Sequence, residues 1–111
     1  MKKKNNSQQK FRQGDVLLLA IAKAPAKTQP VPLELGRVIL AHGEVTGHHH
    51  SFAADSGVAL LEGDGGERFL RVEHESRLEH QEHDTLLIPP GEYIVRRQKE
   101  YSPEAIRSVA D

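Results

Sequence analysis

The histidines are the most chemically capable side chains of this sequence, and their spacing indicates a shared site. There are seven histidines among 111 residues, and three of them, His48, His49 and His50, are consecutive. If this run lies in a β-strand, His48 and His50 point to one face of the sheet and His49 points to the other. Two imidazoles on one face offer two nitrogen ligands to a single metal ion. The spacing therefore predicts a metal site centred on His48 and His50.

Further ligands are expected from side chains near this pair and from a second segment later in the chain. His83 or His80 is expected to complete the site, and the sequence does not choose between them. Asp55, Glu79 and Glu82 are close enough in sequence to supply an oxygen ligand or to orient a histidine. Such a ligand set suits zinc, iron(II), manganese or nickel, and ligand type alone does not choose among them. An open coordination position would provide Lewis-acid chemistry or an activated water.

The same histidines have a simpler interpretation as solvated surface residues. The segments 73–75 and 79–83 alternate acidic side chains with imidazoles, and exposed ion pairs of this kind contribute less than ~1 kcal/mol each. This interpretation fits His74 and His42 better than a ligand role does. His49 is expected to face away from any site that His48 and His50 share.

Composition excludes several classes of function. There are no cysteines, which excludes disulfides, thiolate zinc sites and cysteine nucleophiles. The formal net charge is −1 at pH 7, so a general electrostatic affinity for nucleic acid or membranes is not expected. No apolar run approaches the ~18–20 residues of a membrane span. The basic start, residues 1–4, is not followed by the apolar segment of a signal peptide, and we therefore expect a cytoplasmic protein.

Short apolar or alternating segments separated by Gly and Pro predict an all-β domain, a small barrel or sandwich. The stretch 24–32 is rich in proline and is at best the edge of a sheet, whereas residues 63–66 predict a flexible hairpin turn. Strands are expected at residues 16–21, 37–41, 44–46, 48–52, 58–61, 68–73, 78–80, 85–88 and 92–97.

Both ends of the chain are expected to differ from the β domain. Residues 1–10 are polar and predict a disordered tail, which leaves residues 11–111 as a single domain. Ser102-Pro103-Glu104 is typical of the start of a helix, with a hydroxyl cap, a proline and an acid in the first turn. We therefore expect a short C-terminal helix over residues 105–110.

The residues around the triple histidine resemble the first motif of the cupin family. That motif runs Gly, five residues, His-x-His, three or four residues and Glu. Here Gly43 stands one residue too close to His48, and Asp55 takes the place of the usual Glu. The resemblance implies a double-stranded β-helix barrel with His48, His50 and Asp55 as metal ligands.

The second cupin motif is also only partly matched. It runs Gly, five residues, Pro-x-Gly, two residues and His, and Pro89-Pro90-Gly91 fits its centre. Position 83 is His where the motif has Gly, and position 94 is Ile where the motif has its last ligand. The resemblance spans residues 43–94 and implies an incomplete metal site unless His80 or His83 replaces the missing ligand.

A second resemblance covers nearly the whole chain. The segments Arg12–Leu17, Gly43–His50, which reads Gly-Glu-Val-Thr-Gly-His-His-His, and Pro89–Val95 are similar to short uncharacterised bacterial and phage-type proteins. This resemblance implies no particular activity.

Three functions remain in view. The first is a small accessory or binding protein with a metal-binding histidine site, acting through an unidentified protein partner or as a homodimer formed by strand edges. The second is a cupin-like metal-dependent enzyme acting on a small molecule, which needs a concave pocket beside the ligands. The third is a nucleic-acid-backbone binder using Arg96, Arg97 and Lys99, with strongly salt-dependent affinity. The lack of a recognisable nucleophile outside the histidines favours the first.

Overall fold

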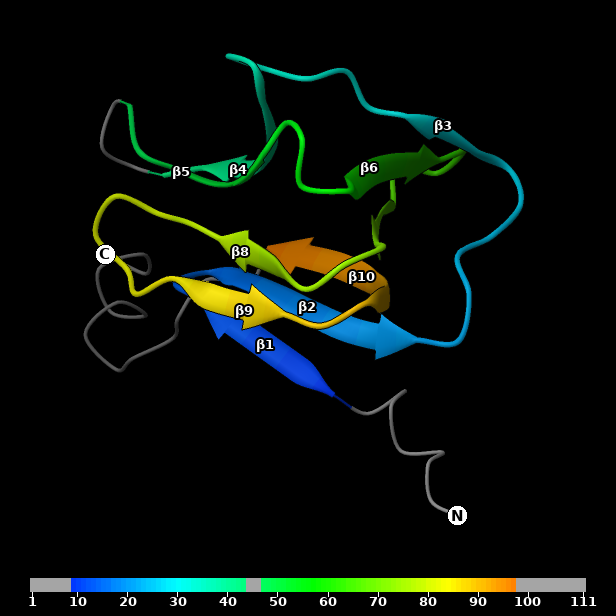
Figure 1. Cartoon of the computed structure of the whole chain (residues 1–111). Helices are drawn as coiled ribbons and strands as arrows, with labels where there is room; N and C mark the ends of the chain where they lie inside the picture. Colours follow the sequence, from blue (N-terminus) through cyan, green and yellow to red (C-terminus); the bar gives the residue numbers. More distant parts are fainter. Residues whose placement is uncertain (1–8, 44–46, 98–111) are drawn as a thin grey trace, which may run out of the picture.

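The structure is all-β and is described by a computed structural model at residues 9–43 and 47–97 (Figure 1). Every strand pairs antiparallel with its neighbours. The strands are β1 (Lys10–Gln13), β2 (Val16–Ile21), β3 (Thr28–Pro30), β4 (Arg37–His42), β5 (His49–Ala53), β6 (Val58–Gly63), β7 (Arg68–Val72), β8 (Ser76–Leu78), β9 (Leu86–Ile88) and β10 (Gly91–Arg97).

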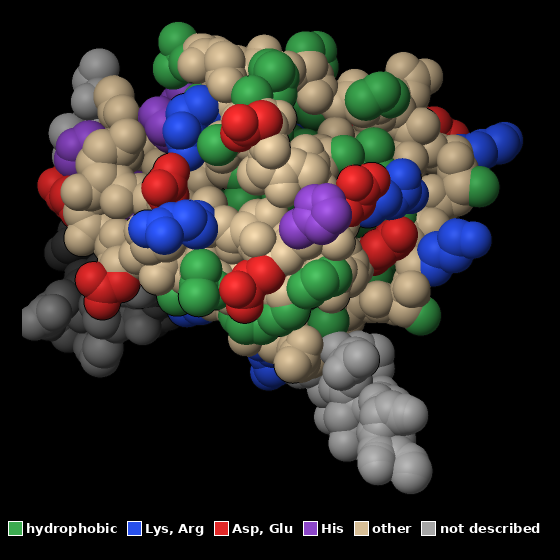
Figure 2. Space-filling view, viewed as in Figure 1, with side chains coloured by type: hydrophobic (Ala, Val, Ile, Leu, Met, Phe, Trp, Pro, Cys, Tyr) green, Lys and Arg blue, Asp and Glu red, His purple; other side chains and the backbone are tan. Residues whose placement is uncertain are grey.

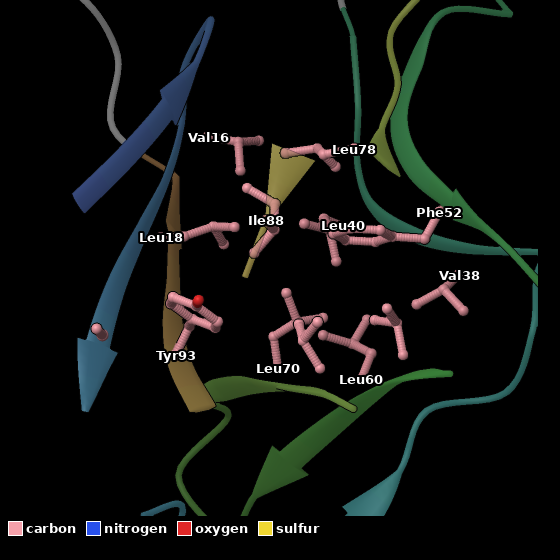
Figure 3. Close-up of a cluster of buried hydrophobic side chains, with 13 residues drawn as sticks. Val16, Leu18, Val38, Leu40, Phe52, Leu60, Leu70, Leu78, Ile88 and Tyr93 are labelled. Carbon is pink, nitrogen blue, oxygen red and sulfur yellow. The ribbon is translucent and has the colours of Figure 1, made fainter. Parts of the chain in front are cut away.

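These strands form two facing layers, which make a sandwich-like fold and not a closed barrel. One layer is a six-stranded sheet in the order β1-β2-β10-β7-β6-β3. The other contains the pairs β4-β5 and β8-β9, which are joined by a bridge between Ser51 and Glu79. Figure 3 shows core side chains filling the space between β2 and β10 on one side and β4 and β5 on the other. The predicted all-β class is confirmed.

Alternating apolar residues produce the core between the layers. In β2, Val16, Leu18 and Ala20 point inward and are buried, whereas the residues between them are only half-buried. Burying a leucine or phenylalanine side chain completely contributes roughly 1.5–3 kcal/mol. The largest core residue, Tyr93, satisfies its polar end by donating its hydroxyl to the Pro89 carbonyl at 2.7 Å. The main cluster contains Val16, Leu18, Ala20, Val38, Leu40, Phe52, Val58, Leu60, Leu70, Val72, Leu78, Ile88 and Tyr93.

A smaller apolar cluster lies outside the main core. Ala24, Leu61 and Phe69 are buried in it, and Ile21 and Ile94 pack against them. Tyr93 and Ile94 are neighbours in β10 and therefore point to opposite faces of the six-stranded sheet. The position that a cupin would use for its last ligand is thus occupied by an isoleucine in an apolar environment.

Several predictions about single elements can be compared with the structure. The proline-rich stretch does provide an edge strand, because β3 is the last strand of the six-stranded sheet. Strand β1 begins at Lys10, one residue before the predicted domain start. The predicted strand at 44–46, the helix at 105–110 and residues 1–8 of the tail lie outside the described residues. In the part of the chain that the structure describes, no helix is long and apolar enough to cross a membrane.

Candidate histidine site

Four of the five predicted ligands come together at one edge of the sandwich. His48 immediately precedes β5, His50 lies near its start, and His80 and His83 come from the connection between β8 and β9. The ring centroid of His80 lies 5.6 Å from that of His48, 4.4 Å from that of His50 and 4.5 Å from that of His83. Figure 2 shows histidine side chains gathered at one edge of the visible face, apart from another nearer its centre.

The predicted alternation of the triple histidine is present. His48 and His50 lie on the side of His80, whereas His49 lies with Ser51 and His42 on the opposite side of β5. His49 Nδ1 is 2.9 Å from Ser51 Oγ. The chain therefore carries two separate groups of histidines, one on each side of β5.

The ring of His50 is held in a defined orientation by Gln13. His50 is 2% exposed, and its Nδ1 lies 2.8 Å from Gln13 Oε1. The amide nitrogen of Gln13 donates to the backbone oxygens of Leu78 and Asp84, each at 2.9 Å. The amide oxygen must therefore accept, so Nδ1 of His50 carries the hydrogen. In the neutral ring this leaves Nε2 as a free lone pair, which is how many metal-binding histidines are prepared.

The free nitrogen of His50 faces a carboxylate in the turn between β1 and β2. Nε2 of His50 lies 3.5 Å from Oδ1 of Asp15, a residue that was not among the predicted ligands. The other carboxylate oxygen of Asp15 accepts a hydrogen bond from Arg97 Nε at 2.8 Å. Burial alone would raise the pKa of Asp15, but the hydrogen bond and charge of Arg97 lower it overall. Asp15 is therefore ionised at neutral pH.

Gly14 allows two imidazoles to meet above this turn. A Cβ atom at Gly14 would lie 2.7 Å from His83 Nε2 and 3.2 Å from His50 Cε1, both closer than normal contacts. The residue also has a φ of +58°, which glycine adopts without strain. The rings of His50 and His83 are nearly parallel, with centroids 5.8 Å apart. The turn thus brings one carboxylate and two ring nitrogens to the same place.

His80 presents the opposite tautomer. Its Nδ1 accepts hydrogen bonds from the backbone N–H groups of Glu82 and His83 at 3.0 and 3.3 Å. In the neutral ring the hydrogen therefore lies on Nε2, which cannot bind a metal in this state. Glu82 reaches the cluster from the other side, with Oε2 3.7 Å from His48 Nδ1.

The environment of the cluster favours neutral imidazoles. Burial, followed by the repulsive effect of a charged His80, lowers the pKa of His50 to about 4. Burial and His83 likewise lower the pKa of His80. Because metals bind the unprotonated nitrogen of histidine, a lowered pKa keeps these ligands available at neutral pH.

The described side chains are not yet arranged as a complete metal site. Among residues 9–43 and 47–97, no three His, Asp or Glu side chains are already placed to hold one metal ion. The predicted oxygen ligand Asp55 is exposed in the turn after β5, at the opposite end of that strand from His50. Glu79 is also engaged elsewhere, because its carboxylate lies 2.7 Å from Arg37. Among the described residues, Asp15 and Glu82 are the carboxylates that lie within 4 Å of the four clustered histidines.

The described residues give less support to the other two predicted functions, nucleic-acid binding and a cupin-like enzyme. Arg97 is paired with Asp15, Arg96 is exposed, and Lys99 lies outside the described residues. A pocket of ≈ 430 Å³ lies beside β3 and the turn after β6, and no histidine lines it. Its lining residues are Gln29, Pro30, Val31, Pro32, Glu62, Gly63, Asp64 and Arg68.

One known family matches most of the described chain. The family model of a domain of unknown function, DUF8820, matches residues 12–98. The chain belongs to this family. The matched region contains Gln13, Asp15 and all four clustered histidines, so the candidate site lies within the DUF8820 domain. No curated protein and no solved structure matches the chain. The resemblance to uncharacterised proteins is therefore supported at the level of this family.

Proposed function

We propose that this DUF8820 domain is a small accessory protein that binds a divalent first-row transition metal at the turn between β1 and β2. His50, His83 and Asp15 supply the central ligands, and His48 or His80 completes the set after a side-chain rotation. Neutral imidazole with one carboxylate suits zinc, iron(II), manganese or nickel. The observation that carries the proposal is the fixed orientation of His50.

That orientation directs a lone pair toward a negative charge. Nε2 of His50 and Oδ1 of Asp15 are 3.5 Å apart, and both are acceptors when His50 is neutral. Two facing acceptors repel each other unless a proton, a cation or a hydrogen-donating water lies between them. A proton is disfavoured there at neutral pH, because burial lowers the pKa of His50 to about 4. A metal cation satisfies both groups and also the nearby ring of His83.

The side chains around His50 have room to move into positions where they can bind the same ion. His83 and Glu82 are exposed and His80 and His48 are half-buried, so their rings have room to rotate. His50 is held by Gln13, whose own hydrogen bonds reach the backbone on either side of the connection that carries His80 and His83. The metal would therefore tie β5, the β1–β2 turn and the β8–β9 connection together.

The proposal is tested by metal titration of untagged protein purified without nickel resin. Isothermal titration with Zn²⁺ is expected to show one site, which His83→Gln or Asp15→Asn weakens at least about tenfold. Changes in groups that bind or orient a metal typically cost 10–100-fold in affinity. Both residues are partly or largely exposed, so neither variant should unfold the domain.

The matched control is His74→Gln, which removes an exposed histidine outside the cluster. It should bind Zn²⁺ as the wild type does. No binding by the wild type, to Zn²⁺, Fe²⁺, Mn²⁺ or Ni²⁺, would overturn the proposal. Equal affinity in the His83→Gln and His74→Gln variants would overturn the assigned ligands.

The cupin-like enzyme is not favoured, because Ile94 packs in the smaller apolar cluster at the position of the missing ligand. Phosphate-backbone binding is weakened as a candidate by the Asp15–Arg97 pair. Self-association through a strand edge stays a prediction, and light scattering of the metal-loaded and metal-free protein measures it directly.

A further inference from the structure

The connection between β3 and β4 presents apolar side chains to solvent. Among the residues that the structure describes, the large apolar side chains that are exposed are Leu33, Leu35 and Leu87, at 54%, 75% and 55%. Two of the three lie in this one connection, and Pro32 before them is exposed as well. The connection runs along the upper rim of the molecule in Figure 1, and Figure 2 shows hydrophobic side chains along the same rim. Apolar surface gathered on one segment is typical of a surface that binds another molecule.

The backbone of Leu35 is in a conformation that a leucine adopts only at a cost. Its φ is +55°, in the left-handed region. Leu35 and Gly36 form a two-residue turn, closed by two backbone hydrogen bonds of 2.9 Å between Glu34 and Arg37. Asparagine or glycine fits such a position better. A leucine that is both strained and exposed does not serve folding, and such residues are expected at functional sites.

An open pocket of ≈ 430 Å³ lies beside the start of the same connection. One wall is Pro30, Val31 and Pro32, which lead directly to Leu33, and the opposite wall belongs to the turn after β6. Pro30 and Pro32 have no backbone N–H, so this edge of the sheet is poorly suited to pairing with an added strand. A bound molecule would therefore be held mainly through side chains that enter the pocket and contact the leucines.

The ionisable side chains that line the pocket carry a net negative charge. They are Glu62, Asp64 and Arg68. Arg68 lies 3.3 Å from Glu62 and balances that carboxylate, which leaves the charge of Asp64. The exposed Glu67 places a further carboxylate against the glycines of the same turn, whereas Lys27, just before β3, is not among the lining residues. The pocket therefore favours a cationic side chain.

We propose that the β3–β4 connection and this pocket form a docking surface for a peptide segment of a partner protein that carries both aliphatic and basic side chains. The aliphatic side chains pack on Leu33 and Leu35. A lysine or arginine lays its aliphatic stem along Pro30 and Pro32 and brings its charge to Asp64. The surface shares no residue with the histidine cluster, so it does not depend on the proposed metal binding.

The charge of the pocket decides among the possible occupants. A two-fold contact with a second copy of the chain would place the same surface on both sides of the interface, and the carboxylates of Asp64 and Glu67 would face like charges. Nucleic acids and anionic membranes are repelled by the same carboxylates. A basic and apolar peptide is the occupant that matches both the leucines and the acidic pocket.

The test measures fluorescence anisotropy of a labelled peptide that alternates leucine and lysine, added to the metal-free full chain in the presence of EDTA. Saturable binding is expected, and it should weaken as the salt concentration rises. A second peptide, with glutamate in place of every lysine, should bind at least about tenfold more weakly. The Leu33→Ser/Leu35→Asn variant should also lose at least about tenfold in affinity, without a fall in its thermal midpoint, because both leucines are exposed.

Two matched controls remove the same chemistry elsewhere on the surface. Leu87→Ser replaces an equally exposed leucine in β9, and Asp55→Lys reverses an exposed carboxylate in another turn. Both should bind the leucine–lysine peptide as the wild type does, whereas Asp64→Lys should bind it at least about tenfold more weakly.

Four results would overturn the proposal. The first is that the leucine–lysine peptide does not bind, and the second is that Leu87→Ser weakens binding as much as Leu33→Ser/Leu35→Asn does. The third is a dimer in light scattering that Leu33→Ser/Leu35→Asn converts to a monomer, because a second copy then covers the surface. The fourth is tighter peptide binding by a Lys2→Gln/Lys3→Gln/Lys4→Gln variant, because the basic start of the chain itself then competes for the surface. None of these results bears on metal binding at His50.

Discussion

The side chain of Gln13 should be important for stability, and Gln13→Met tests this directly. Gln13 is 3% exposed and makes hydrogen bonds to the Leu78 oxygen, the Asp84 oxygen and the His50 ring. Methionine has a similar length and no hydrogen-bonding amide. Each lost bond costs about 1 kcal/mol net. The Asp84 oxygen belongs to an exposed residue and can bind water instead, so the expected loss is about 2–3 kcal/mol in the free energy of unfolding.

Urea denaturation of the metal-free protein measures this loss through the midpoint and the slope. The control is Gln29→Met, because Gln29 is exposed in the edge strand β3. The control should change stability by less than about 0.5 kcal/mol. If Gln13→Met is no more destabilising than Gln29→Met, the network that fixes the His50 ring does not exist as described. The inferred His50 tautomer would then have no basis.

The other predictions concern pH and two turns. Burial lowers the pKa of His50 from 6.5 to about 4, so the unfolded chain takes up a proton before the folded one does. The free energy of unfolding of the metal-free protein should therefore fall by up to about 3 kcal/mol as the pH falls from 6.5 to 4. Urea midpoints across this pH range measure the loss. A His50→Leu variant with the same pH dependence as the wild type would contradict this prediction. Gly14→Ala should destabilise the protein by about 1 kcal/mol, because Gly14 has a positive φ, and should displace the His83 ring. An unchanged His83 NMR signal together with an unchanged urea midpoint would refute the close contact between Gly14 and His83. Leu35 has a φ of +55° and is 75% exposed. Leu35→Asn should therefore stabilise the protein by about 1 kcal/mol, because asparagine adopts this conformation more readily. A lower thermal midpoint in the variant would show that the contacts of the leucine outweigh its backbone strain.

The strands were predictable because their side chains alternate. Segments such as 68–72 and 91–97 place apolar residues on a buried face, and the structure contains strands at both. The arrangement of His48 and His50 on one side of β5 follows from the same period of two. The outward-facing position of His49 was predictable for that reason as well.

The carboxylate that lies beside His50 was not predictable from distance along the chain. Asp55 follows His50 closely in the sequence, but a strand advances about 3.3 Å per residue and separates sequence neighbours in space. Asp15 and Gln13 approach His50 because the β1–β2 turn packs beside the start of β5. Nothing local in the sequence indicates that packing, and Gly14-Asp15 alone predicts only a turn.

Burying His50 has a cost that an apolar residue at the same position would not have. An apolar side chain of similar size would fill the same space without requiring Gln13 or facing Asp15, and it would not weaken the fold as the pH falls. The histidine instead exposes the fold to acid, since its pKa is about 4 in the folded state. Local choices that cost stability are expected where a site needs them. The hydrogen bonds of Gln13 also determine that Nε2 is the nitrogen of His50 without a hydrogen. A side chain whose role is only to fill space in the core does not need this. Both features are explained together if Nε2 must be available to a cation beside Asp15.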